Sequence, residues 1–329
     1  MGGTVSPQRG RGRCDARTTS RLTAPPTPVT YVTHRGGDCF GRTGTFAGPL
    51  KTSTARILLV IALVGAKTIQ TLSSFGRFGI FAWQTLRWLG PSLPLVRTWR
   101  RTMPLFYEVG NRTVPVIAIT GTFVGLVLAI QSYDQLKSAG FEQRMGVLVS
   151  LTLVQELGPV LAGVMVAGRV GGALTAELGT MRVTDQISAM TVMGVDPIRN
   201  LVVPRFLACL LLTPLLTFFC DFCGSLSGWF IAVQLKNIPS GPYWFYIQQS
   251  IEKWDLLVGL IKSLFFGGAI GLISCYKGFH CRSGAAGVGQ ACTQSFVMSF
   301  ITILVADFFI GYFLSGLYRG LYGFKSLVQ

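Results

Sequence analysis

Five long apolar stretches occupy most of the chain after its first third, and each holds at most one charged residue. They cover residues 113–133, 145–168, 206–235, 256–276 and 294–318. About 20 helical residues are needed to cross roughly 30 Å of hydrocarbon. The pattern therefore predicts an all-α integral membrane protein with five transmembrane helices.

Four of these stretches carry a single charge, which is Glu156, Asp221, Lys262 or Asp307. An acidic residue at mid-membrane costs about 2.5–3.5 kcal/mol on insertion scales, whereas each Leu, Ile, Phe or Val returns about 0.3–0.6 kcal/mol. The many large apolar residues around Asp221 outweigh that cost, so we expect the segment to insert. Each charge must then find a partner or water inside the membrane.

The chain before the first predicted span has a different pattern. Residues 57–66 are apolar but too few to cross a bilayer. Between residues 78 and 96, apolar positions such as Phe78, Phe81 and Leu86 recur at helical spacing, with Arg87 on another face. This pattern predicts an amphipathic helix lying in the membrane interface, within an interfacial region over 57–112. The alternative is an ordinary helix packed against the bundle.

Residues 1–56 contain nine Lys or Arg, two acids and fourteen Ser or Thr. A basic, hydroxyl-rich and acid-poor leader without an apolar core is typical of an organelle transit peptide. We therefore expect this leader to be removed or disordered. The alternative is a disordered basic tail on a protein of the bacterial inner membrane.

Composition and charge restrict the class of protein further. Half of the 329 residues are hydrophobic and only 13% are charged, which argues against a soluble enzyme. The net charge of +16 arises mainly before residue 113, in a region with little core-forming sequence, so nucleic acid is not an expected partner. Basic residues in the short connections place the region 169–205 on the cytoplasm-like side.

No catalytic, metal or cofactor site is expected from the motifs of this chain. The pair Cys220 and Cys223 lies within an apolar stretch, and neither histidine, His34 or His280, belongs to an HExxH motif. The chain also has no GxxxxGK[ST] sequence for a phosphate-binding loop. Any ATP must therefore be bound by another polypeptide.

The stretch between Gln155 and Arg205 is rich in Gly, Pro and charge, which a helix facing only lipid does not need. Arg169 and Glu177 are eight residues apart, about 12 Å along a helix and within one broad face. We expect them either to order polar groups at the mouth of a cavity or to form a structural ion pair. A short amphipathic segment and a Gly-Pro turn then return the chain to the membrane.

These residues closely resemble the MlaE-type permease family, the membrane subunits of lipid-transporting ABC systems, and especially its plastid members from the trigalactosyldiacylglycerol lipid importer. The resemblance covers about residues 73–318, and we assign residues 113–329 to a permease domain. It depends on several short motifs taken together: residues 155–159, 167–169, 176–181, 194–197, 204–205, 284–289 and 306–308.

The resemblance implies that residues 181–198 are the coupling helix, seated in a groove of a separate ATPase subunit. The residues expected to serve this coupling are Met181, Arg182, Asp185, Gln186, Met190, Gly194, Asp196, Pro197 and Arg205. It also implies a homodimer that works with mce-class lipid-binding proteins and carries a glycerophospholipid such as phosphatidic acid. Gly121 and Gly125, spaced as GxxxG, would allow close helix contact in that dimer.

The candidate residues for the substrate cavity are Glu156, Arg169, Glu177, Asp221, Lys262 and Asp307. Arg169 and Lys262 have the charge to meet an anionic phosphate. The three acids within spans are expected mainly to satisfy these cations or neighbouring backbone. The alternative function is a proton-coupled secondary transporter in which Glu156, Asp221 and Asp307 act as a relay.

Overall fold

The computed structural model describes residues 52–92 and 96–322, and all the regular structure in these two ranges is helical. Residues 1–60 and 61–329 form separate units, and of the first unit only the opening turns of α1 are described. The predicted leader over 1–56 therefore lies almost entirely outside the described residues. The fold below is that of the second unit.

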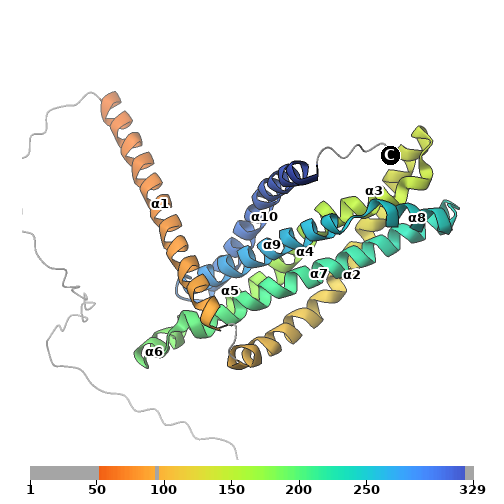
Figure 1. Ribbon diagram of the computed structural model, residues 1–329. Helices are drawn as coiled ribbons and strands as arrows, with labels where there is room; N and C mark the ends of the chain where they lie inside the picture. Colours follow the sequence, from red (N-terminus) through yellow and green to blue (C-terminus); the bar gives the residue numbers. More distant parts are fainter. Residues whose placement is uncertain (1–51, 93–95, 323–329) are drawn as a thin grey trace, which may run out of the picture. The chain divides into compact units, whose positions relative to one another are not determined.

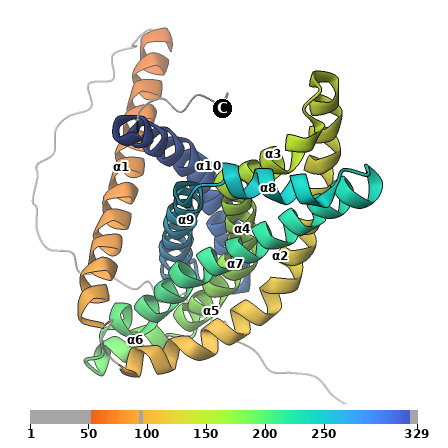
Figure 2. The same ribbon diagram turned by 45° about the vertical axis from the view of Figure 1, so that its right-hand side comes forward.

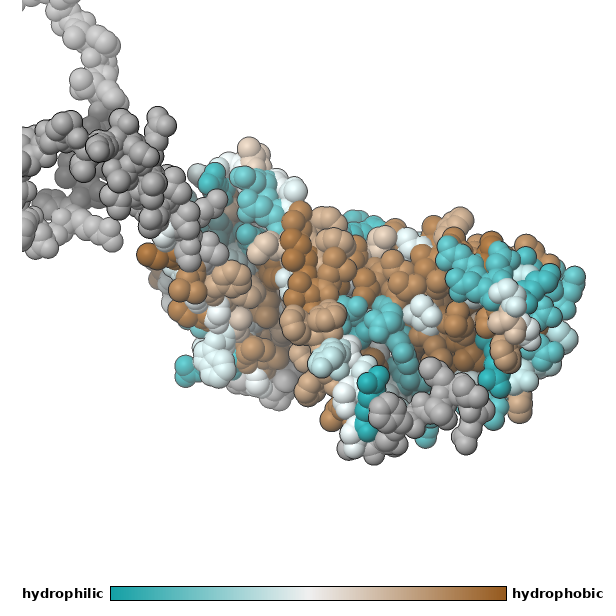
Figure 3. Space-filling view, turned by 90° about the horizontal axis from the view of Figure 1, so that it is seen from above, coloured by the Kyte–Doolittle hydropathy of each residue, from teal (hydrophilic) through white to brown (hydrophobic). Residues whose placement is uncertain are grey.

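Five candidate spans confirm the predicted fold class. They run over Gly110–Ala139, Glu142–Val183, Ile198–Leu235, Lys253–Phe279 and Ala285–Gly320. The spans are longer than the apolar stretches because polar residues continue the helices at both ends. In Figure 3 a broad hydrophobic band crosses the visible face, and hydrophilic residues gather at its right-hand end.

The first span belongs to the long helix α2 (Val96–Ala139), and the third belongs to α7 (Val203–Phe230) followed by a π-helical turn, η5 (Ile231–Leu235). The fourth is α9 (Lys253–Phe279) and the fifth is α10 (Ala285–Tyr322). A short helix, α8 (Ser240–Ser250), connects the third span to the fourth. Figures 1 and 2 show α2 and α7 running side by side.

The second span is built from short helical pieces rather than one regular helix. After the 3₁₀ turn η1 (Glu142–Arg144), α-helical and π-helical segments alternate. They are α3 (Met145–Thr152), η2 (Leu153–Leu157), α4 (Gly158–Val166), η3 (Ala167–Gly171) and α5 (Gly172–Val183). Pro159 lacks an N–H and lies in the first turn of α4, two residues after η2 ends, so one backbone hydrogen bond of a regular α-helix cannot form there.

Small residues allow the helices to approach closely. A side chain at Gly121 or Gly125 of α2 would meet the backbone of α7, at Cys220 and Gly224 respectively. The GxxxG pair predicted to serve a dimer contact therefore lies in a contact within one chain. Ile117, Leu216, Phe266 and Ile303 are all buried in the resulting core.

The N-terminal region differs from its prediction. The apolar run and the amphipathic segment form one continuous helix, α1 (Thr52–Ser92), and residues 97–112 belong to α2. Phe78 and Phe81, two of the apolar positions at helical spacing, pack against Tyr276 of α9 with ring centroids 5.2 and 5.6 Å apart, as the alternative of a helix packed against the bundle expects. The exposed apolar stripe of α1 includes Leu72, Trp83 and Leu86, of which only Leu86 was among the three apolar positions named above.

At the far end of the bundle, α8 packs against α3 through Tyr243. Its ring fills the space beside Gly146 and is buried. Burial raises the pKa of the Tyr243 hydroxyl to about 12, because the charged form would lose its hydration. This contact fixes the connection between the third and fourth spans.

Candidate functional site

Lys262 is the centre of a buried charge cluster that joins three helical segments. Its ammonium Nζ lies 2.7 Å from Glu156 Oε2 of η2 and 3.0 Å from Asp307 Oδ1 of α10. The Lys262 side chain is completely buried, whereas that of Glu156 is 53% exposed. Gly311, one turn after Asp307, leaves space for the ammonium.

The geometry favours the expectation that these two acids satisfy a neighbouring cation. Because two carboxylates share one ammonium, the cluster presents acceptor oxygens rather than a free cation. That arrangement does not favour Lys262 as a direct partner for a lipid phosphate. Nearby, Gln155 donates a 2.7 Å hydrogen bond to Asp255 and further connects η2 with α9.

Asp221 lies apart from this cluster, on α7. Its Oδ1 atom is buried without a hydrogen-bond partner and points at Gly158, where an added Cβ would overlap it. The sequence shows both residues but not that they meet, since 62 other residues separate them. The alternative function needs a proton relay through Glu156, Asp221 and Asp307. In the described ranges, Asp221 forms no hydrogen bond with either of the other two acids.

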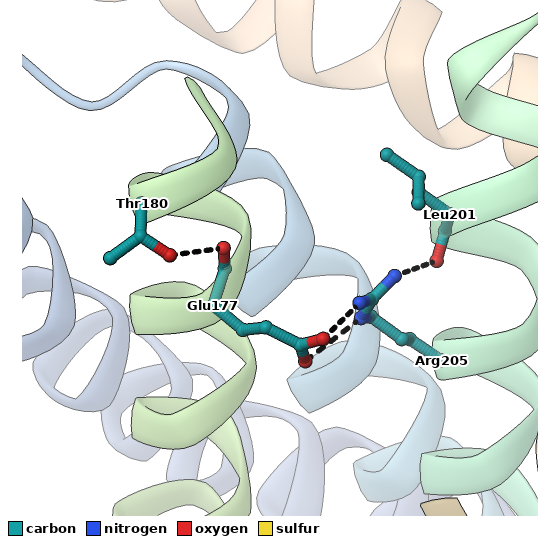
Figure 4. Close-up of polar contacts among 4 residues, drawn as sticks. All are labelled: Glu177, Thr180, Leu201 and Arg205. Atoms are coloured by element: carbon teal, nitrogen blue, oxygen red, sulfur yellow. Dashed lines mark hydrogen bonds and ion pairs between the residues drawn. The ribbon is translucent and has the colours of Figure 1, made fainter. Parts of the chain in front are cut away.

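Glu177 pairs with Arg205 rather than with Arg169. The Arg205 guanidinium donates to both carboxylate oxygens of Glu177, at 2.5 and 3.3 Å, and to the Leu201 carbonyl at 2.9 Å (Figure 4). The Arg205 side chain is only 7% exposed, so this charge is turned into the protein. The pair connects α5 to α7 and does not leave Arg205 on the surface predicted for ATPase contact.

Arg169 lies on η3 and is exposed. Within the part of the chain that the structure describes, it has no hydrogen bond or ion pair. The expected eight-residue partnership with Glu177 is not formed, because Glu177 is occupied by Arg205. Arg169 therefore remains the one cavity candidate whose cation is available to an external anion.

The predicted coupling segment consists of a short helix between two turns. Met181 and Arg182 end α5, Asp185 adopts a left-handed conformation with φ of 57°, and α6 (Gln186–Val192) follows. In α6, Gln186 is exposed and Met190 is half-buried. Ile187, which the sequence reasoning did not single out, is buried and anchors α6 to the bundle.

The return turn after α6 is fixed by backbone geometry. Gly194 has φ of 75°, which favours glycine. Asp196 Oδ1 accepts the N–H of Ile198 at 3.0 Å, and Pro197 precedes the π-helical turn η4 (Ile198–Val202). Beyond these contacts, Val192 and Met193 are 88% and 70% exposed and form an apolar tip at this end of the molecule.

The described ranges contain no group of three or more His, Cys, Asp or Glu residues suited to a metal ion. The candidate site consists of the ion pairs within the spans and the exposed segment between the second and third spans. Its charged residues are Arg169, the Glu177–Arg205 pair and the Lys262 cluster.

Comparisons with known proteins identify the family of this chain. The family model described as Permease MlaE matches residues 102–313. A probable ABC transporter permease protein of Rickettsia typhi is 38% identical over 255 residues, which cover 77% of this chain and 97% of the relative. The intermembrane phospholipid transport system permease protein MlaE of Haemophilus influenzae is 34% identical over 259 residues, with the same coverage of both chains.

A plant protein is also similar. TRIGALACTOSYLDIACYLGLYCEROL 1, chloroplastic, of Arabidopsis thaliana is 34% identical over 238 residues, covering 69% of this chain and 68% of the relative. The region matched by the family model, residues 102–313, contains the first four spans, most of the fifth, and the segment that connects the second span to the third. The chain therefore belongs to the MlaE permease family.

Proposed function

We propose that this chain is the permease subunit of an ABC-type transporter that moves glycerophospholipid between membranes. The main support is the exposure of Val192 and Met193, the apolar tip of residues 181–198, at one end of the five spans. A short helix held between two spans transmits force as a rigid body. One relative named as a probable ABC transporter permease and another named as an intermembrane phospholipid transport system permease support this interpretation.

In this proposal a separate ATPase supplies the energy and binds the ATP. The absence of a phosphate-binding loop motif from the sequence supports this division of labour. The ATPase would seat the apolar tip of α6, and two copies of the permease would form the membrane core. An mce-class lipid-binding protein would carry lipid to or from the opposite end of the spans.

The cargo requires an apolar wall for acyl chains and a polar group for the head group. The spans provide the wall, and the unpaired Arg169 has the charge to meet a phosphate. For the compartment, we propose the inner envelope of a plastid. The composition of residues 1–56 and the similarity to a chloroplastic relative support that location.

The turn after α6 offers the sharpest test. Asp196→Ala with Pro197→Ala removes the side-chain oxygen that accepts the Ile198 N–H and the fixed backbone angle of the proline, which together hold this turn. In proteoliposomes containing the complete transporter, we expect ATP hydrolysis to continue while ATP-driven phospholipid transfer falls roughly tenfold, equivalent to about 1.4 kcal/mol. Asp134→Asn, an exposed change at the opposite end of α2, is the control.

Transfer and hydrolysis are measured on the same vesicles, with insertion checked by protease protection. Unchanged lipid transfer per ATP in the double variant would contradict the coupling role. Lipid movement by the chain alone, driven by a pH gradient and without an ATPase, would instead favour the proton-coupled alternative.

A further inference from the structure

Two neighbouring cavities lie between α1 and the coupling segment. The first has a volume of about 450 Å³ and is lined by Gln84, Arg87, Trp88, Asp196 and Ile198. The second, of about 370 Å³, shares Gln84 and Ile198 with the first. We call the two cavities together the α1–α6 groove, and both views of the ribbon place this end of α1 beside α5 and α6 (Figures 1 and 2).

The walls of the groove combine apolar and cationic groups. Its second cavity has Phe81, Ile187 and Phe279 as apolar walls, with Arg77 and His280 at its polar side. Such a combination fits an amphiphile with an anionic head group. The apolar walls can contact an acyl chain, and guanidinium groups can donate hydrogen bonds to a phosphate.

Charge in the groove favours an anion. Arg77 and Arg87 face it, and Asp196 is the one carboxylate among the residues that line it. That carboxylate already accepts the Ile198 N–H. Arg87 has no hydrogen bond or ion pair within the described ranges, so its donors are available to a ligand.

A further cation fixes the wall of the groove. The Arg199 guanidinium lies over the Trp88 ring, 5.0 Å from its centroid, in a cation–π contact. This contact joins η4 to α1 directly. The groove is therefore bounded on both sides by elements that Arg199 and Trp88 hold together.

The surface of α1 that faces away from the bundle indicates how the groove lies relative to a membrane. Leu72, Phe75, Trp83 and Leu86 are exposed and recur at helical spacing. Around the helix, the strip of Arg77 and Arg87 lies between this exposed apolar stripe and the packed face. An interfacial helix with that pattern places its cations at the level of lipid head groups.

We infer that the α1–α6 groove binds an anionic phospholipid of the surrounding bilayer, with its phosphate held by Arg87 in the first cavity and an acyl chain against Phe81 and Ile187 in the second, where Arg77 adds positive charge. This lipid is a resident ligand at the membrane surface, distinct from a cargo handled near Arg169. Because Asp196 and Ile198 line the groove, the bound lipid would restrain the coupling segment. That consequence rests on the proposed function, whereas the binding does not.

The test uses the full chain in phosphatidylcholine nanodiscs, with and without phosphatidic acid, and with no nucleotide or ATPase present. Native mass spectrometry counts retained phosphatidic acid, and hydrogen exchange follows residues 77–88 and 187–199. We expect phosphatidic acid to be retained and to protect both segments. Soluble glycerol phosphate, which lacks acyl chains, is expected to protect neither.

Arg77→Gln with Arg87→Gln is expected to weaken retention roughly 30-fold, since each arginine near anionic lipid contributes about fivefold. The control, Lys277→Gln with Arg282→Gln, removes the same charge at the same end but outside the groove. It is expected to retain phosphatidic acid as the parent chain does.

Two results would overturn the inference. Equal losses in the two double variants would mean a general attraction of the basic surface to anionic membrane. Equal retention of phosphatidylcholine would mean that the groove does not select charge. Each result is obtained without transport, so failure here leaves the proposed function intact.

Discussion

At the scale of single residues, Glu177 and Arg205 differ sharply in their surroundings. Arg205 is 7% exposed, while Glu177 is 44% exposed and reaches water. Removing the acid would leave a buried cation with only the Leu201 carbonyl, whereas removing the cation would leave an acid that water can solvate. The two halves of this pair are therefore not equivalent.

We predict that Glu177→Gln lowers the free energy of unfolding by about 2–4 kcal/mol, because it strands a buried charge. Arg205→Met is predicted to cost less, about 1–2 kcal/mol. The double variant should lose less than the sum. Thermal unfolding in detergent gives the comparison, and a larger loss for Arg205→Met than for Glu177→Gln would contradict the assigned burial.

Gly158 and Asp221 make a second residue-scale prediction. Gly158→Ala places a methyl group against the buried Asp221 carboxylate and is expected to destabilise the protein by about 1–3 kcal/mol. Asp221→Ala in the same chain should relieve most of the loss. The control is Gly172→Ala, where no atom lies within 4 Å and helix propensity favours alanine by up to about 1 kcal/mol. Equal losses at both glycines would refute the contact.

Residue identity was easier to predict than residue partnership. The sequence indicates that Glu156, Lys262 and Asp307 need partners, because isolated charges in apolar helices are costly. It does not indicate that Glu177 selects Arg205 over Arg169. That choice depends on how α5 packs against α7, over a separation of 28 residues.

At the scale of elements, the Lys262 cluster connects η2, α9 and α10. Lys262→Met would leave two carboxylates without their cation, and we predict that the free energy of unfolding falls by about 2–4 kcal/mol. The loss is limited to this range because Glu156 is half exposed and water can solvate its carboxylate. Adding Glu156→Gln and Asp307→Asn should recover most of it. Lys253→Met, which changes an exposed lysine at the start of the same helix, should alter stability by about 0.5 kcal/mol or less.

Thermal unfolding of the purified chain in detergent also checks this cluster. If the neutral triple variant is less stable than Lys262→Met alone, the ion pairs do not account for the burial of Lys262.

Helix type and span number could be predicted from hydropathy, but helix continuity could not. Lys67 ends an apolar run in the sequence, yet α1 continues through it to Ser92. A single charge does not interrupt backbone hydrogen bonding, so the helix continues where the apolar pattern stops. The π-helical turns of the second span were also not predicted, because they depend on Pro159 and on contacts with α9.

At the scale of the whole molecule, five spans, an exposed segment and an N-terminal helix together suit a membrane subunit moved from outside. Hydropathy was sufficient for the membrane class, and the short motifs between residues 155 and 205 were sufficient for the family. The groove beside α1 could not be predicted, because it arises only where α1 and the coupling segment meet.

The central claim is that this chain forms the lipid path and an external ATPase drives it. The most direct measurement is transfer of a fluorescent phospholipid from proteoliposomes to acceptor vesicles, with the chain reconstituted alone or with its ATPase and mce-class partners. We predict ATP-dependent transfer only from the complete assembly. Equal transfer by the chain alone, with no nucleotide present, would contradict the account.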